Sequence, residues 1–468
     1  MPIDPWELAQ WDAVETRSHL ERKDVTTAEV VEAAIARARE LQWLNAIVTP
    51  TFEQALAGAG AAKGPFAGVP FFLKDLVRSK GVRTAWGTAA TGDYIATVDD
   101  PSVKAFNALG LVSLGKSATP ELGLTATTEP LAFGPCHNPW ARGHSTGGSS
   151  GGAAALVASG VVPIAHASDG GGSIRIPAAC CGLVGLKPTR GRFDMEGSNM
   201  LPVNVAVHGV VSRTVRDSVE FWKALETVLP SKRFPAVGAA APRPAKRLRI
   251  GMFLGLPVEV TVDPEVRAAT QEAARLLEQL GHRVEEIPCP ASREVLDDFV
   301  SLWAYISWVQ PRASRFVIGR PMDLEKLEPL TRDFAARFLS RKWATFTELK
   351  RLRGWTRGYT EACARLGFDA FLSPTLASLP PPHGYLKPDL PFDTQIERLT
   401  GFCPFTGLFN TAGAPAISLP LARAGNGMPI GVQLAAPHGA DALLLELGAE
   451  LEEAKPWPRL APRPVAAA

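Results

Sequence analysis

The chain contains 468 residues, of which 46% are hydrophobic and 21% charged, so it can bury a large core and is not an intrinsically disordered protein. Its 49 basic and 47 acidic residues leave a formal net charge of +2, which does not favour binding to nucleic acid or to an anionic membrane. The six cysteines form no Cys-x-x-Cys pair, which argues against a disulfide framework or a zinc site.

The N-terminus has no basic start followed by an apolar run, so we expect no signal peptide. The most apolar region, residues 153–167, is interrupted by Gly160 and Pro163 and is too short to cross a bilayer. Together with the unpaired cysteines, these features favour a cytoplasmic protein whose partners include neither nucleic acid nor a membrane.

The first clear helix is predicted to begin at Thr26, which forms a capping-box pattern with Glu29. Residues 69–73 then indicate a short buried strand. Small side chains over residues 153–159 predict a helix, and residues 161–167 predict another buried strand. Because a glycine-rich turn precedes this helix and another follows this strand, we expect both turns at one end of a sheet.

A β-α-β pattern follows in the second half of the chain. Residues 248–253 and 283–287 indicate strands. Between them a helix is predicted to begin at Pro264 after an N-cap at Asp263, and to end at Gly281. This order of elements favours the α/β class.

Two proline-rich segments punctuate the chain, one a possible linker over residues 230–244 and the other a possible surface lid over residues 374–400. Residues 416–421 and 430–434 flank an Asn-Gly pair and predict a β-hairpin. The chain is expected to close with a helix over residues 440–451.

Serines lie in both glycine-rich turns. Ser149 lies in the first turn, residues 147–152, and Ser173 ends the second, residues 169–173. Amide hydrolysis by covalent catalysis needs a nucleophile, a base and donors for the developing oxyanion. Ser173 is the better candidate nucleophile, because successive N–H groups before it can be directed at a carbonyl oxygen. A merely flexible turn is the alternative interpretation.

The base is less clear from the residues alone. His166 lies seven residues before Ser173 inside an apolar strand, which favours a packing role over that of a base. His144 precedes the first turn, but no acid partner is evident for a Ser-His-Asp triad. Lys74 follows an apolar run, and burial would lower its pKa enough to make it a base. Most lysines instead extend to solvent.

The two glycine-rich turns belong to a longer set of motifs at residues 68–75, 115–121, 147–155, 168–177, 185–192, 410–420 and 427–433. Through these motifs the sequence resembles the amidase signature family over nearly its whole length. The resemblance implies an α/β amidase signature fold, with a large twisted mixed β-sheet flanked on both faces by α-helices, in a single domain over residues 1–468. We expect no cofactor and no metal.

Members of that family use a Ser–cisSer–Lys triad. By position in the motifs, the resemblance makes Ser173 the nucleophile and Lys74 the base. Ser149 becomes the bridging serine, which in the family follows a cis peptide bond. Ser150 corresponds to an accessory serine that forms hydrogen bonds within the site.

The turn before the nucleophile also receives expected roles, some from the spacing of its residues and some from the resemblance. The spacing of Asp169 and Arg175 indicates a buried ion pair that brackets this turn. An acyl-enzyme on Ser173 is the intermediate that the family implies. The expected oxyanion hole consists of the N–H groups of Gly170, Gly171, Gly172 and Ser173.

Within the family, the chain is similar to aminohexanoate cyclic-dimer hydrolases, aryl acylamidases and urethanases at residues 64–70, 127–130 and 138–140. The cyclic-dimer hydrolases have a substrate-contacting asparagine where this chain has Leu124, so we expect a more apolar pocket. The candidate pocket residues are Gly123, Leu124, Thr125, Gln395 and Ile396.

We therefore expect a hydrolase that cleaves the C–N bond of small amides or carbamates (urethanes), with apolar or aryl substrates, acting as a monomer or homodimer. The alternative is the glutaminase subunit of a tRNA-dependent amidotransferase. Those subunits hold glutamine partly through an aspartate, and our alignment places Cys403 there, which argues against glutamine. A catalytically inactive binding protein is disfavoured because Lys74, Ser149 and Ser173 are all present.

Overall fold

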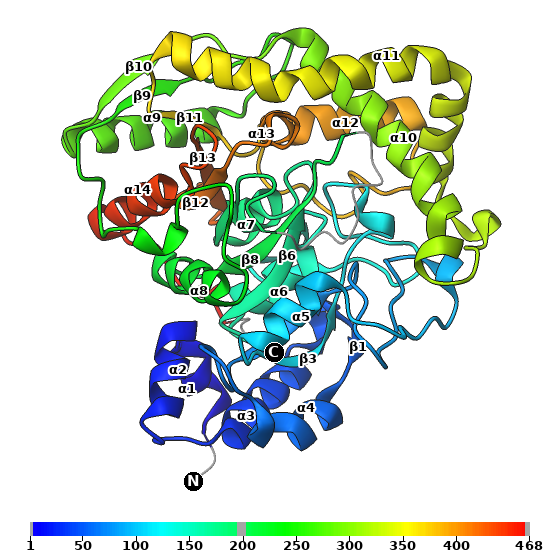
Figure 1. The fold of residues 1–468 in the computed structure, drawn as a ribbon, viewed down its shortest axis with the longest axis vertical. Coiled ribbons are helices and arrows are strands. Elements are labelled where there is room, and N and C mark those ends of the chain that lie inside the picture. The colour runs from blue at the N-terminus through cyan, green and yellow to red at the C-terminus, as the bar shows by residue number, and fades with distance from the viewer. Residues whose placement is uncertain (1–2, 194–202, 464–468) are drawn as a thin grey trace.

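The centre of the protein is an eight-stranded mixed β-sheet, seen in a computed structural model that describes residues 3–193 and 203–463 (Figure 1). The strand order is β10-β9-β11-β13-β12-β7-β8-β6. The first three strands run parallel, and every other neighbouring pair is antiparallel. In sheet order the strands span Arg283–Glu286, Arg249–Met252, Ala370–Pro374, Pro429–Ala435, Ala416–Arg423, Val184–Lys187, Val207–Ser212 and Ile164–Asp169.

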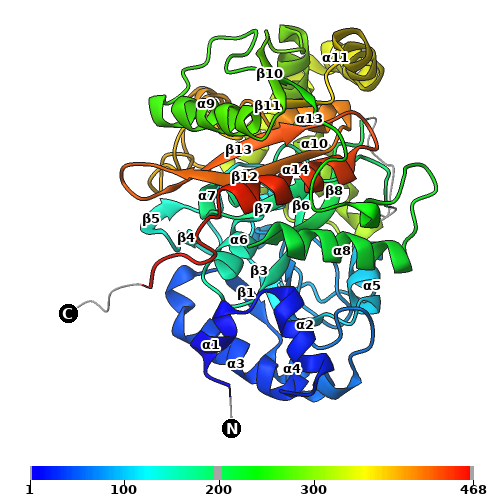
Figure 2. The same ribbon diagram turned by 90° about the vertical axis from the view of Figure 1, so that its left-hand side faces the viewer.

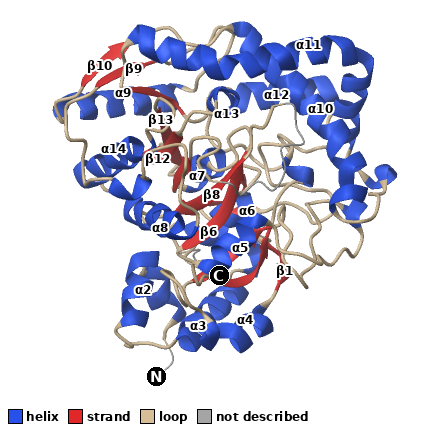
Figure 3. Cartoon of the chain, viewed as in Figure 1, coloured by secondary structure: helices blue, strands red, loops and turns tan. Residues whose placement is uncertain are grey.

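Helices flank both faces of this sheet (Figures 2 and 3). Helices α7 (Arg175–Cys181) and α14 (Asp441–Ala454) both pack on β12, and α9 (Pro264–Gln279) packs against β11 and β13. Helix α8 (Val215–Val228) lies against β7 and β8. The observed architecture confirms the predicted α/β class and the large mixed β-sheet flanked on both faces by α-helices. Within the described residues, no helix is both long enough and apolar enough to cross a bilayer.

A second, three-stranded sheet lies beside β6 and has the order β1-β3-β2. It brings β2 alongside β6, although the two strands belong to different sheets. Helix α6, which begins at Gly151 within the first glycine-rich turn, packs against β6, β2 and β8. The elements of this region are α3 (Thr27–Glu40), β1 (Ile47–Pro50), α4 (Phe52–Gly58), β2 (Pro70–Lys74), α5 (Pro101–Ala108), β3 (Val112–Ser117), β4 (His137–Asn138), β5 (Ala141–Ser145) and α6 (Gly151–Ala158).

A long helical hairpin, which we did not predict, covers the upper and right-hand part of the molecule in Figure 1. It consists of α10 (Arg293–Val317) and α11 (Pro329–Leu366), and α11 bends at Arg341, whose φ and ψ are −124° and 18°. Helix α10 also packs on α13 (Gly407–Ala412), and α11 contacts α12 (Phe392–Phe402). The hairpin therefore places residues far from the sequence motifs close to the second glycine-rich turn.

Most predicted elements are present, and the capping box at Thr26 and the Asp263 N-cap are confirmed. The β-hairpin at residues 416–434 and the C-terminal helix are also confirmed. The proline-rich segment over residues 230–244 is irregular apart from a short 3-10 helix at Val237–Ala239.

One expectation about the order of the helices was wrong. The helix after Thr26 is not the first, because α1 (Pro5–Gln10) and α2 (Ala13–Glu21) precede it. A contact distant in sequence stabilises α2, since the Asp217 carboxylate accepts hydrogen bonds from the first two N–H groups of that helix. In the segment of the possible lid, Pro380 and Pro381 are buried, Pro382 is exposed, and the Pro381 carbonyl accepts a hydrogen bond from the Ser145 N–H.

Candidate active site

Lys74 is the last residue of β2, and its side chain is fully buried beside β6. Its Nζ lies 2.7 Å from Ser149 Oγ, 3.1 Å from Ser168 Oγ and 3.5 Å from the Ser168 carbonyl oxygen. Burial lowers the pKa of Lys74 to about 7, although the negative charge of Asp169 opposes this shift. A lysine with this pKa is in good part neutral at neutral pH, so its lone pair can accept a proton.

The first glycine-rich turn presents Ser149 to this lysine. The Gly148–Ser149 peptide bond is cis, as the family resemblance implies. There is no room for a side chain at Gly148, where a Cβ would lie 2.6 Å from the Thr127 carbonyl oxygen. Ser150, the expected accessory serine, bonds to β6: its Oγ accepts a hydrogen bond from the Ser168 N–H at 3.3 Å.

The second glycine-rich turn connects β6 to α7 and carries Ser173, which is 7% exposed and lines a cavity. Asp169 organises this turn by accepting hydrogen bonds from the Gly172 N–H at 2.7 Å and the Ile174 N–H at 3.2 Å. The Gly172 N–H is thus directed at Asp169 and not into the cavity, which is a departure from the expected oxyanion hole. The N–H groups of Gly170, Gly171 and Ser173 are the donors of this turn that Asp169 does not bind.

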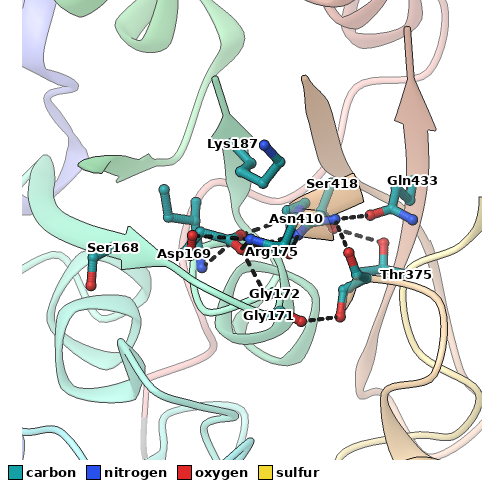
Figure 4. Close-up of polar contacts among 12 residues, drawn as sticks. Ser168, Asp169, Gly171, Gly172, Arg175, Lys187, Thr375, Asn410, Ser418 and Gln433 are labelled. Carbon is teal, nitrogen blue, oxygen red and sulfur yellow. Dashed lines mark hydrogen bonds and ion pairs between the residues drawn. The ribbon is translucent and has the colours of Figure 1, made fainter. Parts of the chain in front are cut away.

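A buried ion pair supports the turn, as the spacing of Asp169 and Arg175 predicts (Figure 4). The guanidinium of Arg175 donates to both carboxylate oxygens of Asp169 at 3.0 Å and also to Gln433 and Asn410 at 2.6 Å. Burial by itself would raise the pKa of Asp169, but the charge and hydrogen bonds of Arg175, the charge of Lys187 and the hydrogen bond from Asn410 together outweigh it and lower this pKa to about 2. The carboxylate therefore stays ionised, and its fixed hydrogen bonds hold the turn in one conformation.

Ser173 opens onto a cavity of about 1060 Å³. Four of the five predicted pocket residues line it, namely Gly123, Leu124, Thr125 and Ile396. The prediction for Gln395 was wrong: this side chain is fully buried away from the cavity, and its Nε2 donates to the Leu386 carbonyl oxygen at 3.0 Å.

A model of the amidase family matches residues 29–445 of the chain. The sequence is 43% identical over 464 residues to a putative amidase AmiC of Mycobacterium bovis, covering 97% of this chain and 96% of the relative. This chain belongs to the amidase signature family. It is a hydrolase that acts on amides. Over 487 residues it is also 36% identical to the 6-aminohexanoate-cyclic-dimer hydrolase of Paenarthrobacter ureafaciens, covering 97% of this chain and 96% of that one.

Solved structures agree with this membership. A 6-aminohexanoate cyclic dimer hydrolase superposes with a TM-score of 0.87 at 33% identity, covering 97% of this chain and 98% of the other. A bacterial aryl acylamidase superposes with a TM-score of 0.84 at 26% identity and covers 96% of each chain. A glutamyl-tRNA(Gln) amidotransferase subunit from Thermotoga maritima, at 24% identity and a TM-score of 0.70, shares the fold alone.

Sequence reasoning missed two aromatic residues of this amidase, Phe299 and Trp303, which lie one turn apart on α10 and line the cavity. Their ring centroids are 4.8 Å apart, and the Trp303 Nε1–H donates to the Leu124 carbonyl oxygen at 2.8 Å. A Cβ at Gly171 would lie 2.9 Å from the Phe299 ring, so the rings cover the turn that carries Ser173. Their i, i+4 spacing indicates a helix face and does not show what that face covers.

Ser168 is another contact that sequence reasoning missed, although it stands beside the Asp-Gly-Gly-Gly motif. Because side chains alternate along a strand, Ser168 and His166 lie on the same face of β6, and both contact Lys74. Strand alternation is the signal that would have paired Ser168 with the buried lysine, once β2 was known to lie beside β6.

Histidines take no part in the cavity. No histidine of the described residues lines it, and no group of three or more His, Cys, Asp or Glu side chains there is arranged to hold a metal ion. His144 forms an isolated β-bridge with Pro382, and His166 is packed in the core as predicted. The geometry therefore gives no support to a Ser-His-Asp triad.

Proposed function

We propose that this amidase hydrolyses amides and carbamates of apolar or aryl groups through an acyl-enzyme on Ser173. One observation carries the proposal: a buried lysine, with a pKa near 7, lies 2.7 Å from the Ser149 hydroxyl beside the cavity that Ser173 lines. The buried lysine supplies a base, and the glycine-rich turn supplies a nucleophile with neighbouring N–H donors.

In the proposed reaction, neutral Lys74 accepts the proton of Ser149 as Ser149 accepts that of Ser173. The Ser173 Oγ then forms a bond to the carbonyl carbon, and the N–H groups of Gly170, Gly171 and Ser173 stabilise the oxyanion. Collapse of the tetrahedral intermediate breaks the C–N bond. The relay returns a proton to the leaving amine, and water then releases the acyl group by the same sequence of proton transfers.

The preference for apolar substrates rests on the wall of the cavity. Part of the cavity wall beside the second turn is aliphatic and aromatic, formed by Leu124, Ile176, Phe299 and Trp303. Such a wall binds a flat apolar group through buried area, and about 25 cal/mol is gained per Å² removed from water. A carbamate presents a carbonyl of the same geometry as an amide, so the same site accommodates aryl carbamates.

The same cavity disfavours glutamine. Cys403 lines it and stands where our alignment places the aspartate of the glutaminase subunits. Burial raises the pKa of the Cys403 thiol to about 12, so the group is neutral. A neutral thiol provides no negative charge for the ammonium group of free glutamine.

A hydrolysis panel on the isolated protein tests this proposal: a nitroanilide, an aryl carbamate, an aliphatic amide and glutamine. We expect the nitroanilide and the carbamate to give the largest kcat/KM, and mass spectrometry of a quenched reaction to find the acyl group on Ser173. The Ser173→Ala variant is the control and should not turn over. Turnover by that variant, or preference for glutamine, would overturn the proposal.

A further inference from the structure

His166 is fully buried in β6 and bonds to the main chain of Lys74, not to any serine of the site. Its Nδ1 accepts a hydrogen bond from the Lys74 N–H at 3.1 Å. On the other side of the ring, Nε2 lies 2.9 Å from Nδ1 of His208, a half-buried residue of β8. The ring of Phe106 packs against His166 with centroids 5.0 Å apart, which leaves the imidazole little freedom to turn.

These contacts specify one tautomer of each imidazole. A backbone N–H can only donate, so the Nδ1 of His166 carries no proton. Neutral His166 is therefore protonated at Nε2 and donates to His208, whose own Nδ1 is the acceptor. Burial lowers the pKa of His166 well below its usual value and that of His208 to about 4, so both rings are neutral at neutral pH.

The bond from His166 replaces a strand partner that Lys74 lacks. Strand β2 is paired with β3 on one side, but on its other side it lies beside β6 without joining its ladder. Without His166, the buried N–H of Lys74 would lose its acceptor, and an unsatisfied buried donor destabilises a structure. Strand β6 thus holds the lysine at two points, through His166 at the main chain and through Ser168 at Nζ.

We infer that His166, oriented by His208, is a positioning residue that fixes the main chain of Lys74 and so keeps its Nζ in line with Ser149. The inference rests on the proposed role of Lys74 as the base. It assigns the histidine neither a proton-transfer step nor contact with substrate. Its effect is on the rate of acylation, because a shift of about 1 Å in a catalytic group can reduce a rate by about a hundredfold.

Two substitutions of similar size separate positioning from packing. His166→Asn keeps a side-chain acceptor near the position of Nδ1, whereas His166→Leu fills the space and removes the acceptor. On a nitroanilide substrate we expect His166→Leu to lose about tenfold or more in kcat with KM nearly unchanged. His166→Asn should retain kcat to within about threefold, because a bond to the lysine main chain remains.

Further variants keep the test decisive. His208→Leu leaves His166 in place without its orienting partner, so an intermediate loss of kcat is expected even if His166→Leu fails to fold. His438→Leu is the matched control, because His438 bonds to the Ala412 carbonyl oxygen and has no contact with Lys74. Its kcat should be unchanged. Circular dichroism supplies the folded fraction for each variant.

Equal kcat values for folded His166→Leu and His166→Asn, or wild-type kcat in His208→Leu, would overturn the inference. Failure of the proposed function is recognised separately with Ser173→Ala. Turnover by Ser173→Ala rejects the nucleophile whatever the histidine variants do. An inactive Ser173→Ala beside a fully active His166→Leu rejects the positioning role alone.

Discussion

The rate of this amidase should depend on pH through the titration of Lys74. Burial lowers the pKa of this lysine to about 7, and only the neutral amine can accept a proton from Ser149. As pH falls below that value the protonated fraction rises, so the neutral fraction is about one tenth at one unit below the pKa and about one hundredth at two units. We therefore expect kcat/KM to fall about tenfold per pH unit on the acid side and to level off above pH 7.

The assay is the initial rate of nitroanilide hydrolysis from about pH 5 to about pH 9 at constant ionic strength. A second buried lysine, Lys187, has its pKa lowered by burial to about 7 as well, so it must be distinguished from Lys74. Lys187 donates to the Pro188 carbonyl oxygen and does not contact Ser149, so Lys187→Met should keep the acid limb. Circular dichroism of Ser173→Ala over the same range checks that the fold survives.

Removal of the base provides a second readout. Lys74→Met should leave only a residual rate, and that rate should show no inflection near pH 7. A wild-type profile that is flat through this region would refute the assignment of Lys74 as the base. An acid limb that disappears in Lys187→Met but persists in Lys74→Met would refute it too.

Substitutions at the cavity wall and in the second turn test other contacts of the site. Phe299→Ala removes an aromatic side chain from the wall, so KM for a nitroanilide should rise about ten- to a hundredfold while KM for acetamide changes little. Asp169→Asn leaves the Arg175 charge buried without a counter-charge and should lower the free energy of unfolding in urea by about 3–5 kcal/mol. Gly172→Ala should abolish turnover, because residue 172 has a φ of +132° and the added Cβ would lie 2.3 Å from the hydroxyl oxygen of Thr406. Gly170→Ala should remain active, because its Cβ would lie 3.5 Å from the nearest atom. Equal KM shifts for both substrates in Phe299→Ala would contradict the role of the wall, and an unchanged unfolding curve for Asp169→Asn would contradict that of the ion pair. Equal rates for Gly172→Ala and Gly170→Ala would contradict the close approach at Gly172.

Features encoded by neighbouring residues could be predicted well. The capping box at Thr26 and the N-cap at Asp263 are local patterns, because the capping side chain and the N–H group it binds lie within three residues of each other. The pairing of β12 with β13 is likewise local, since a short turn joins the two strands. The long helices α10 and α11 were missed.

Contacts between distant segments explain the predictions that failed. Helix α2 depends on a carboxylate from α8, and Gln395 faces the core because of how α12 lies on the loop before it. The direction of the Gly172 N–H was also unpredictable, because the same run of glycines can point its donors inward or outward. In each case the local sequence is compatible with more than one arrangement, and the tertiary fold selects between them.

By itself, the sequence determined the membership of the chain in its family, its α/β class and the candidate residues Lys74, Ser149 and Ser173, because these follow from the order and spacing of motifs. Only the tertiary structure decided that the Lys74 side chain is buried and that it forms hydrogen bonds with Ser149 and Ser168. It also decided that α10 places Phe299 beside the second turn. The physical reason is that a pKa and an apolar wall are properties of surroundings. Those surroundings are assembled from strands and helices that are far apart along the chain.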